Sequence, residues 1–338
     1  MIELKNNTKK KLKNYRFIDL FAGVGGFRLA LESFGSKCVF TSEWDEHCQK
    51  VYQMNFNETC HGDITKIPEI NMPNHDILCA GFPCQAFSIS GKQRGFEDSR
   101  GTLFFDIVRI AKYHQPKLLI LENVKNFERH DMGNTLKVVL STLDEIGYKV
   151  KYKVLNASKF GIPQSRKRIF IIGVLKKHSD LFNNYDIPDG NGEYTSLKDF
   201  IVPNSQVEKK CFINNIDLDD YIKNDKKIKP DMFGFYDQKP IRLGIVNKGG
   251  QGERIYSIKG HSITLSAYGG GLFSKTGGYL INGHVRKLNP RECARLTGFP
   301  DSFILLENLN QCWKQFGNCV VVDVIQEVIN SLLRKKII

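Results

Sequence analysis

The string FIDLFAGVGG, residues 17–26, joins an apolar run to a glycine-rich turn, and an amphipathic run over residues 27–34 follows it. A strand, a glycine turn and a helix in this order open a nucleotide-binding α/β unit. An ordinary turn between a strand and a helix explains the glycines equally well. The stretch therefore predicts a doubly wound, mostly parallel α/β sheet, and leaves the ligand open.

The next apolar run is followed by two residues that favour a nucleoside ligand. Glu43 lies 20 residues after Gly23, about where an acidic residue binds ribose hydroxyls, and Trp44 offers a flat face for adenine. A dinucleotide fingerprint would need a third glycine at position 28, which is Arg28. S-adenosylmethionine, a nucleoside without phosphates, therefore fits the turn better than NAD does. Asp63 is suitably placed to accept a hydrogen bond from the adenine amino group.

The string GFPCQAFS, residues 81–88, follows a third apolar run at residues 77–80. Pro83 fixes the backbone just before Cys84, so a thiol is held at the end of a strand, where open α/β sheets bind ligands. The polar and basic residues 88–101 predict a loop. A lone cysteine after a strand is usually a small buried hydrophobe, so its partners decide whether it is a nucleophile.

Two later strings contain candidate partners for this thiol. In ENV, residues 122–124, Glu122 follows four apolar residues, which places it at the same sheet edge as Cys84. Burial there would let it carry a proton at neutral pH, although an acid near a helix start fits as well. In QSRKR, residues 164–168, Arg166 and Arg168 alternate at strand spacing and share a face. They form either a solvated edge or inward-pointing ligands for a carboxylate, a base carbonyl or a phosphate.

Composition limits the class of protein. The chain has 338 residues, with 49 Lys and Arg against 36 Asp and Glu, and this excess favours a polyanionic partner such as nucleic acid. Nine cysteines without a C-x-x-C pair argue against a disulfide framework and a metal site, and for a reducing, cytoplasmic location. We find no apolar run of about 18 residues that predicts a membrane span.

The second half of the chain changes in character. Residues 183–229 are polar and poorly periodic, which predicts a domain boundary. Ten glycines between residues 249 and 283 predict short strands and tight loops. Four polar or aromatic residues lie beside these glycines and either read base edges or face solvent: Gln251, Arg254, Tyr268 and Lys275. Near the end, the string FGNC enters an apolar helix and places Asn318 at its N-terminus.

Taken in order, DLFAGVGG, GFPCQAFS, ENV, QSRKR, RKLNPRECARLTGFP and QFGN resemble the motifs of the DNA (cytosine-5) methyltransferases. The string GGQGERIYS with TLSAYGGG most resembles the HhaI-type methylases of restriction–modification systems, which read GCGC. The resemblance implies the class I S-adenosylmethionine-dependent methyltransferase fold with a smaller, strand- and loop-rich target-recognition domain. The expected divisions are a catalytic and cofactor-binding domain at 1–190, target recognition at 191–289, a hinge at 290–317 and a C-terminal helix at 318–338.

The resemblance also implies an activity and its residues. A methyl group passes from S-adenosylmethionine to carbon 5 of a flipped-out cytosine in double-stranded DNA, while Cys84 attacks carbon 6 and Glu122 bonds ring nitrogen 3. Arg166 and Arg168 orient the base or its phosphates. The implied cofactor residues are Phe21, Gly23, Gly25, Glu43, Trp44, Asp63, Ile64, Pro83, Leu103 and Asn318. The implied DNA contacts are Ser88, Arg100, Gln251, Arg254 and Tyr268. Cys319 follows QFGN where the family commonly has serine.

Three alternatives remain at this point. A tRNA cytosine-5 methyltransferase has the same motif core, but it usually lacks an extended glycine-rich recognition segment. A non-catalytic DNA-binding protein on this fold is disfavoured by Cys84 and Glu122. A dinucleotide oxidoreductase is disfavoured by Arg28. In the favoured interpretation, a cognate restriction endonuclease acts on the same DNA site without binding the chain.

Overall fold

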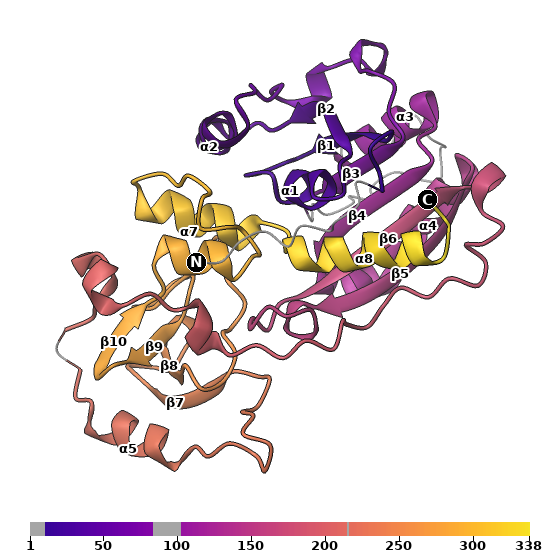
Figure 1. The fold of residues 1–338 in the computed structure, drawn as a ribbon. Coiled ribbons are helices and arrows are strands. Elements are labelled where there is room, and N and C mark those ends of the chain that lie inside the picture. Colours follow the sequence, from indigo (N-terminus) through magenta and orange to yellow (C-terminus); the bar gives the residue numbers. More distant parts are fainter. Residues whose placement is uncertain (1–10, 84–102, 215) are drawn as a thin grey trace. The chain divides into compact units, whose positions relative to one another are not determined.

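The computed structural model describes residues 11–83, 103–214 and 216–338, and these residues form two compact units (Figure 1). The six-stranded unit contains the described residues up to Leu155, together with Lys167–Asp189 and Ile325–Ile338. The four-stranded unit contains Asn156–Arg166 and Gly190–Val324. Cys84, Ser88 and Arg100 lie outside the described residues.

The six-stranded unit is a mostly parallel α/β sheet with strand order β2-β1-β3-β4-β6-β5. Strands β1 to β4 pair in parallel, and β6 is antiparallel to β4. The strands are β1 (Arg16–Leu20), β2 (Lys37–Ser42), β3 (Ile77–Gly81), β4 (Leu118–Val124), β5 (Tyr148–Asn156) and β6 (Lys167–Leu175). The helices are α1 (Gly26–Glu32), α2 (Glu46–Phe56), α3 (Leu103–His114) and α4 (Asn134–Glu145), with most of α8 (Val322–Arg334). This architecture confirms the predicted fold class.

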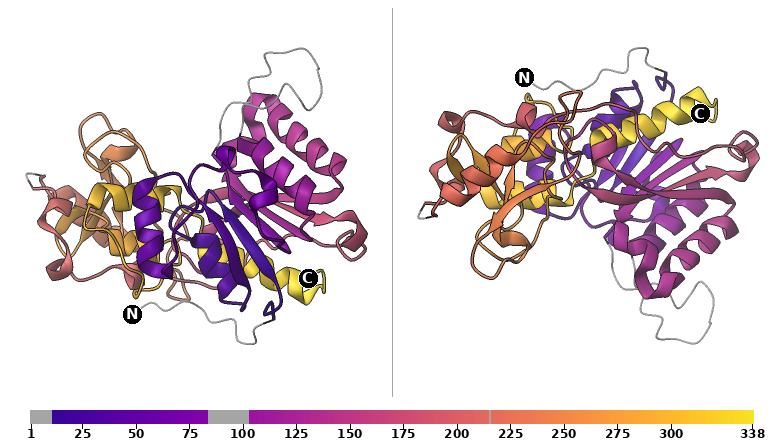
Figure 2. Two further views of the ribbon diagram at one scale, coloured as in Figure 1. Left: turned by 90° about the horizontal axis from the view of Figure 1, so that it is seen from above. Right: turned by 90° about the horizontal axis from the view of Figure 1, so that it is seen from below.

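Helices cover both faces of this sheet (Figure 2). On one face, the apolar sides of α3 and α4 pack against alternate strand residues, among them Ile18 and Leu119, in a single buried core. On the other face, α1 and α8 are neighbours, since Gln326 Nε2 donates a 2.8 Å hydrogen bond to Ser33 Oγ. Burial from both sides explains why β4 begins with four consecutive apolar residues.

The order of the strands predicts a ligand site at one edge of the sheet. Strand β1 lies between β2 and β3, so the connection from β1 to β2 runs to one side and the connection from β2 to β3 crosses to the other. Open sheets bind ligands at such a switch point. Leu20 is the register partner of Ala80, and Gly81 is the partner of Glu122. The glycine turn after β1, the Pro83 turn after β3 and Glu122 therefore meet at the same edge.

The four-stranded unit has the strand order β10-β9-β8-β7. Its strands are β7 (Ile241–Ile245), β8 (Arg254–Ser257), β9 (Gly278–Ile281) and β10 (His284–Lys287), and its helices are α5 (Asp219–Lys227), α6 (Pro290–Arg295) and α7 (Leu309–Asn318). The strands are short, as the glycine-rich composition predicts. Helix α6 begins at Pro290 with a capping box between Asn289 and Glu292.

The predicted helix start at Asn318 is wrong. Asn318 is the last residue of α7, residues 319–321 are not helical, and α8 begins at Val322. By length and hydropathy alone the stretch Leu309–Arg334 would cross a membrane, with a mean hydropathy of 1.3, but 72% of its most apolar 18-residue window is buried in the protein. Core helices pass the same test, so the stretch gives no support for a membrane span.

Candidate active site

The turn after β1 adopts backbone conformations that need glycine. Gly23 and Gly25 have φ values of 56° and 90°, in the left-handed region that side chains disfavour. A Cβ at Gly25 would lie 2.5 Å from the ring of Phe56. A Cβ at Gly23 would have no other atom within 4 Å. Phe21, which is not glycine, also has a positive φ of 56°. Such strain concentrates at ligand sites.

Glu43 is built into this turn. Its Oε2 accepts a 2.7 Å hydrogen bond from the backbone N–H of Gly23, and its Oε1 accepts one of 2.8 Å from Asp45. Burial raises the pKa of Glu43, and these two backbone donors act in the opposite direction. The carboxylate therefore fixes the end of β2 to the glycine turn, a link that the sequence analysis did not predict.

The next predicted residues surround this edge. Trp44 is 79% exposed, so one of its faces is available to a planar ligand. Asp63 Oδ1 accepts hydrogen bonds from the backbone N–H and the hydroxyl of Thr65, and these bonds lower the pKa of Asp63. The carbonyl of Ile64 accepts a 2.7 Å hydrogen bond from Arg109 on α3. Arg109 thus holds the Asp63 turn, a role that the sequence did not indicate.

Glu122 and Arg168 come together, and a carboxylate is one of the partners that the sequence left open for Arg168. Glu122 is 7% exposed, and its Oε1 lies 3.2 Å from Nε of Arg168. Because β4 and β6 are antiparallel neighbours, the two residues are diagonal partners across the strands. Next to Glu122, Asn123 donates a 3.0 Å hydrogen bond to the carbonyl of Phe82 and fixes the turn that contains Pro83. Sequence reasoning assigned no role to Asn123.

Arg166 does not share a strand face with Arg168. It precedes β6, belongs to the four-stranded unit and is 2% exposed. Its guanidinium donates hydrogen bonds to the carbonyls of Leu265, Gly317 and Cys319 at 3.0, 3.1 and 2.6 Å. Through Arg166, these bonds join the segment at Leu265 to the end of α7. They also occupy carbonyls that a continuous helix would use, which explains the break after Asn318.

Two of the residues that the sequence predicts to contact DNA line a hollow of about 200 Å³ in the four-stranded unit. Gln251 and Tyr268 line it, and Tyr268 is 73% exposed. The two loops touch through their glycines, since a Cβ at Gly252 would lie 2.1 Å from the carbonyl oxygen of Gly270. Arg254 is half-buried and donates to the carbonyl of Gly249. Contact between the two glycine loops thus brings Gln251 and Tyr268, which are 17 positions apart in the sequence, to the same hollow.

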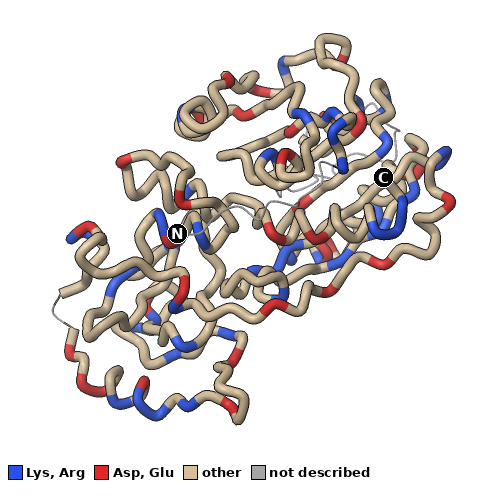
Figure 3. Tube along the Cα trace, viewed as in Figure 1, with Lys and Arg blue, Asp and Glu red and all other residues tan. Residues whose placement is uncertain are grey.

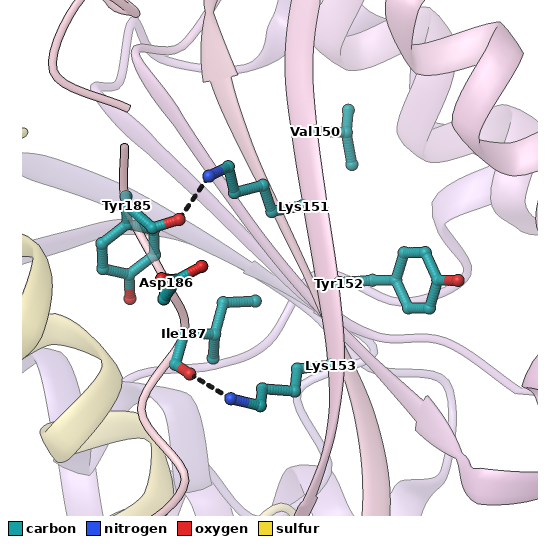
Figure 4. Close-up of a pocket in the computed structure, with 7 residues that line it drawn as sticks. All are labelled: Val150, Lys151, Tyr152, Lys153, Tyr185, Asp186 and Ile187. Atoms are coloured by element: carbon teal, nitrogen blue, oxygen red, sulfur yellow. Dashed lines mark hydrogen bonds between the residues drawn. The ribbon is translucent and has the colours of Figure 1, made fainter. Parts of the chain in front are cut away.

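A second hollow, of about 400 Å³, lies beside β5 and contains none of the predicted residues (Figure 4). Lys151 and Lys153 point into it, and their ammonium groups donate hydrogen bonds to the carbonyls of Tyr185 and Ile187. Lys153 also pairs with Asp189 at 3.0 Å. Because these lysines hold the segment 183–189 against the sheet, the hollow has a structural explanation.

Comparison with known proteins decides the family. A model of the C-5 cytosine-specific DNA methylases matches residues 15–334. The chain belongs to this family. M.HhaI, a type II methyltransferase of Haemophilus parahaemolyticus, is 55% identical to this methylase over 97% of the chain and 96% of its own length. M.HpaII of Haemophilus parainfluenzae is 42% identical over 96% and 90%.

Solved structures agree on the fold. A variant of DNMT2 from Spodoptera frugiperda superposes on the methylase with a TM-score of 0.68 at 21% identity, covering 94% of this chain and 99% of that one. Dnmt2 of S. pombe gives 0.67 at 18% identity, covering 95% and 98%. These matches confirm the S-adenosylmethionine-dependent methyltransferase fold. The methylase is a C-5 cytosine DNA methyltransferase of the type II restriction–modification kind, and its methyl donor is S-adenosylmethionine.

Proposed function

We propose that this methylase modifies carbon 5 of a cytosine flipped out of duplex DNA through a covalent bond between Cys84 and carbon 6. The position of Glu122 carries this proposal. It is buried beside Gly81, three residues before Cys84, and it is paired with Arg168. A carboxyl group at this edge is placed to bond ring nitrogen 3 of a base that Cys84 attacks.

The residues then have defined roles. The Cys84 thiolate adds to carbon 6 as Glu122 bonds nitrogen 3, and the electron pair moves to carbon 5, which becomes nucleophilic. S-adenosylmethionine supplies an electrophilic methyl group for that carbon. Carbon 5 then loses its proton to water, and expulsion of the Cys84 sulfur restores the aromatic ring. The base must leave the helix first, at a cost of a few kcal/mol.

The edge beside β1 suits the proposed cofactor. The open space at Gly23 lets a ligand approach the backbone, and the exposed ring of Trp44 suits adenine. Glu43 has its carboxylate at the turn, where ribose hydroxyls would bind. The other proposed cofactor contacts are Phe21, Gly25, Asp63, Ile64, Pro83, Leu103 and Asn318.

We assign target recognition to the four-stranded unit. The loops that carry Gln251 and Tyr268 line one hollow, and Arg254 begins the neighbouring strand β8. With Ser88 and Arg100, these residues would read a short site, GCGC, and protect cytoplasmic DNA from a cognate endonuclease. We also propose that the catalytic domain ends at residue 190, that target recognition takes residues 191–289, and that residues 290–317 form a hinge before the C-terminal helix.

A mechanism-based substrate tests the covalent step. Duplex DNA with 5-fluorocytosine at the target position should form a stable complex with the wild-type methylase, because fluorine cannot leave carbon 5 as a proton does. The Cys84→Ser variant should form none, and its methylation rate should fall by about a thousandfold or more. A variant that methylates at the wild-type rate would contradict the proposal.

Two substrates test the choice of polymer and site. Purified methylase should transfer tritiated methyl groups to duplex DNA and leave tRNA unlabelled. Bisulfite sequencing of a treated plasmid should show protection at the inner cytosine of GCGC alone. Labelled tRNA with unlabelled DNA would support the RNA alternative, and protection at another sequence would replace GCGC.

A further inference from the structure

Two lysines of the four-stranded unit lie against α7. Lys287 is 8% exposed, and its Nζ lies 3.9 Å from the centre of the Trp313 ring. Nζ of Lys275 lies 3.3 Å from the carbonyl oxygen of Asn310. Among the residues that the structure describes, neither ammonium group forms an ion pair.

The helix brings these two cations to one surface. Asn310, Trp313 and Lys314 are spaced three and four residues apart, so they form one stripe along α7. Lys275 binds at the first position of the stripe, Lys287 at the second, and Lys314 adds a third basic residue. Three lysines from three separate chain segments thus gather on one side of a ten-residue helix.

Among the described residues, the buried Glu292 does not neutralise Lys275 or Lys287. Glu292, five residues after Lys287, is fully buried, and its oxygens accept hydrogen bonds from Arg286 and from the backbone of Asn289 and Val202. Burial lowers the pKa of Lys287, and the neighbouring Lys275 lowers it further. Burial also lowers the pKa of Lys275, with a contribution from Lys314. Holding cations together in this way opposes folding unless an anion binds there.

The position of Lys275 links this stripe to target recognition. Lys275 lines the same hollow as Gln251 and Tyr268, and its φ of 77° is a strained value for a lysine. Elsewhere along the described trace, basic and acidic residues are interspersed (Figure 3). A cationic group without a counter-charge beside base-reading loops suits the backbone of the same nucleic acid.

We propose that Lys275 and Lys287 form a binding site for a phosphodiester group of the DNA backbone, in an inference that rests on the proposed DNA substrate. The ammonium groups position the duplex for the loops that read its bases. Phosphate contacts of this kind carry no sequence information. Their loss should therefore weaken the binding of every duplex by a similar factor.

Salt dependence of binding tests this site. The dissociation constants of two duplexes, one with GCGC and one without, are measured by fluorescence anisotropy across a series of salt concentrations. Lys287→Met and Lys275→Met should each weaken both duplexes several-fold and reduce the slope of log affinity against log salt by about 0.9, which is the value for one phosphate. Lys287→Arg should keep the wild-type slope.

A matched lysine serves as the control. Lys259 belongs to the same unit, but its Nζ lies 3.1 Å from Oδ2 of Asp225, so Lys259→Met should leave the slope unchanged. Thermal unfolding of each variant shows whether it folds. Lys275 is half-buried, so Lys275→Met still tests the site if Lys287→Met does not fold. The site would be overturned if the wild-type methylase bound both duplexes normally but Lys275→Met kept the wild-type slope. The same holds if Lys287→Arg and Lys287→Met gave the same slope. Wild-type methylase that bound neither duplex would contradict the proposed function itself.

Discussion

The glycine turn after β1 and the glycine-rich segment around β8 and β9 use the same residue for different purposes. In the first, Gly23 and Gly25 occupy backbone conformations with positive φ, and nearby residues of the same α/β unit fix them. In the second, Gly252 is needed because another loop passes over it, at Gly270. The comparison teaches that the turn after β1 follows from local geometry, whereas the loops at Gly252 and Gly270 depend on contact between distant segments.

The largest effect should come from Gly25→Ala. The new Cβ would meet the Phe56 ring at 2.5 Å and take a φ of 90°, with a cost of about 1–2 kcal/mol for the backbone and about 1–3 kcal/mol for the overpacking. We expect S-adenosylmethionine affinity, measured by calorimetry, to fall about a hundredfold or more. Gly62→Ala is the control, since a Cβ there meets nothing within 4 Å. Unchanged affinity in Gly25→Ala would remove the role of the turn.

A smaller effect is expected from Gly252→Ala in the recognition segment. A Cβ at 2.1 Å from the carbonyl oxygen of Gly270 must separate the two loops, so kcat/KM for DNA should fall about tenfold, or about 1.4 kcal/mol. S-adenosylmethionine affinity should remain at the wild-type value. Gly270→Ala, where a Cβ meets nothing within 4 Å, is the matched control. Equal losses in both variants would show that the contact between the loops is unimportant.

The last effect concerns stability alone and should leave activity at neutral pH least changed. Asp19, on β1, is fully buried, and neither carboxylate oxygen has a hydrogen-bond partner among the described residues. Burial raises the pKa of Asp19 well above 3.8, so its contribution to stability is present below that pH and is lost as the pH rises toward the raised value.

Asp19→Asn should remove this dependence. Relative to the variant, the wild-type free energy of unfolding should fall by up to about 1.4 kcal/mol per pH unit above pH 3.8, as measured by urea denaturation. Asp144→Asn, whose exposed carboxylate pairs with Lys176, is the control. Parallel pH profiles for wild type and Asp19→Asn would mean that Asp19 is not titrating in the folded protein.

Several site residues were predictable because short-range rules determine them. The interval from Gly23 to Glu43 spans one strand, one helix and a second strand, and the structure joins the two residues by a 2.7 Å hydrogen bond. Glu122 follows an apolar strand, so its place at the sheet edge follows from the parallel pairing of β3 and β4. The supporting roles of Asn123 and Arg109 were not predictable, since their partners lie 41 and 45 residues away.

By itself, the sequence determined the mostly parallel sheet, the glycine turn and the place of Glu122 at the end of its strand, because periodicity and parallel pairing act over one or two elements. Tertiary structure alone decided that QSRKR divides between the two units. Arg168 turns to Glu122, and Arg166 turns to the carbonyls of Leu265, Gly317 and Cys319. Alternation along a strand gives the direction of a side chain, but buried hydrogen-bond acceptors from distant segments decide where a guanidinium group finally binds.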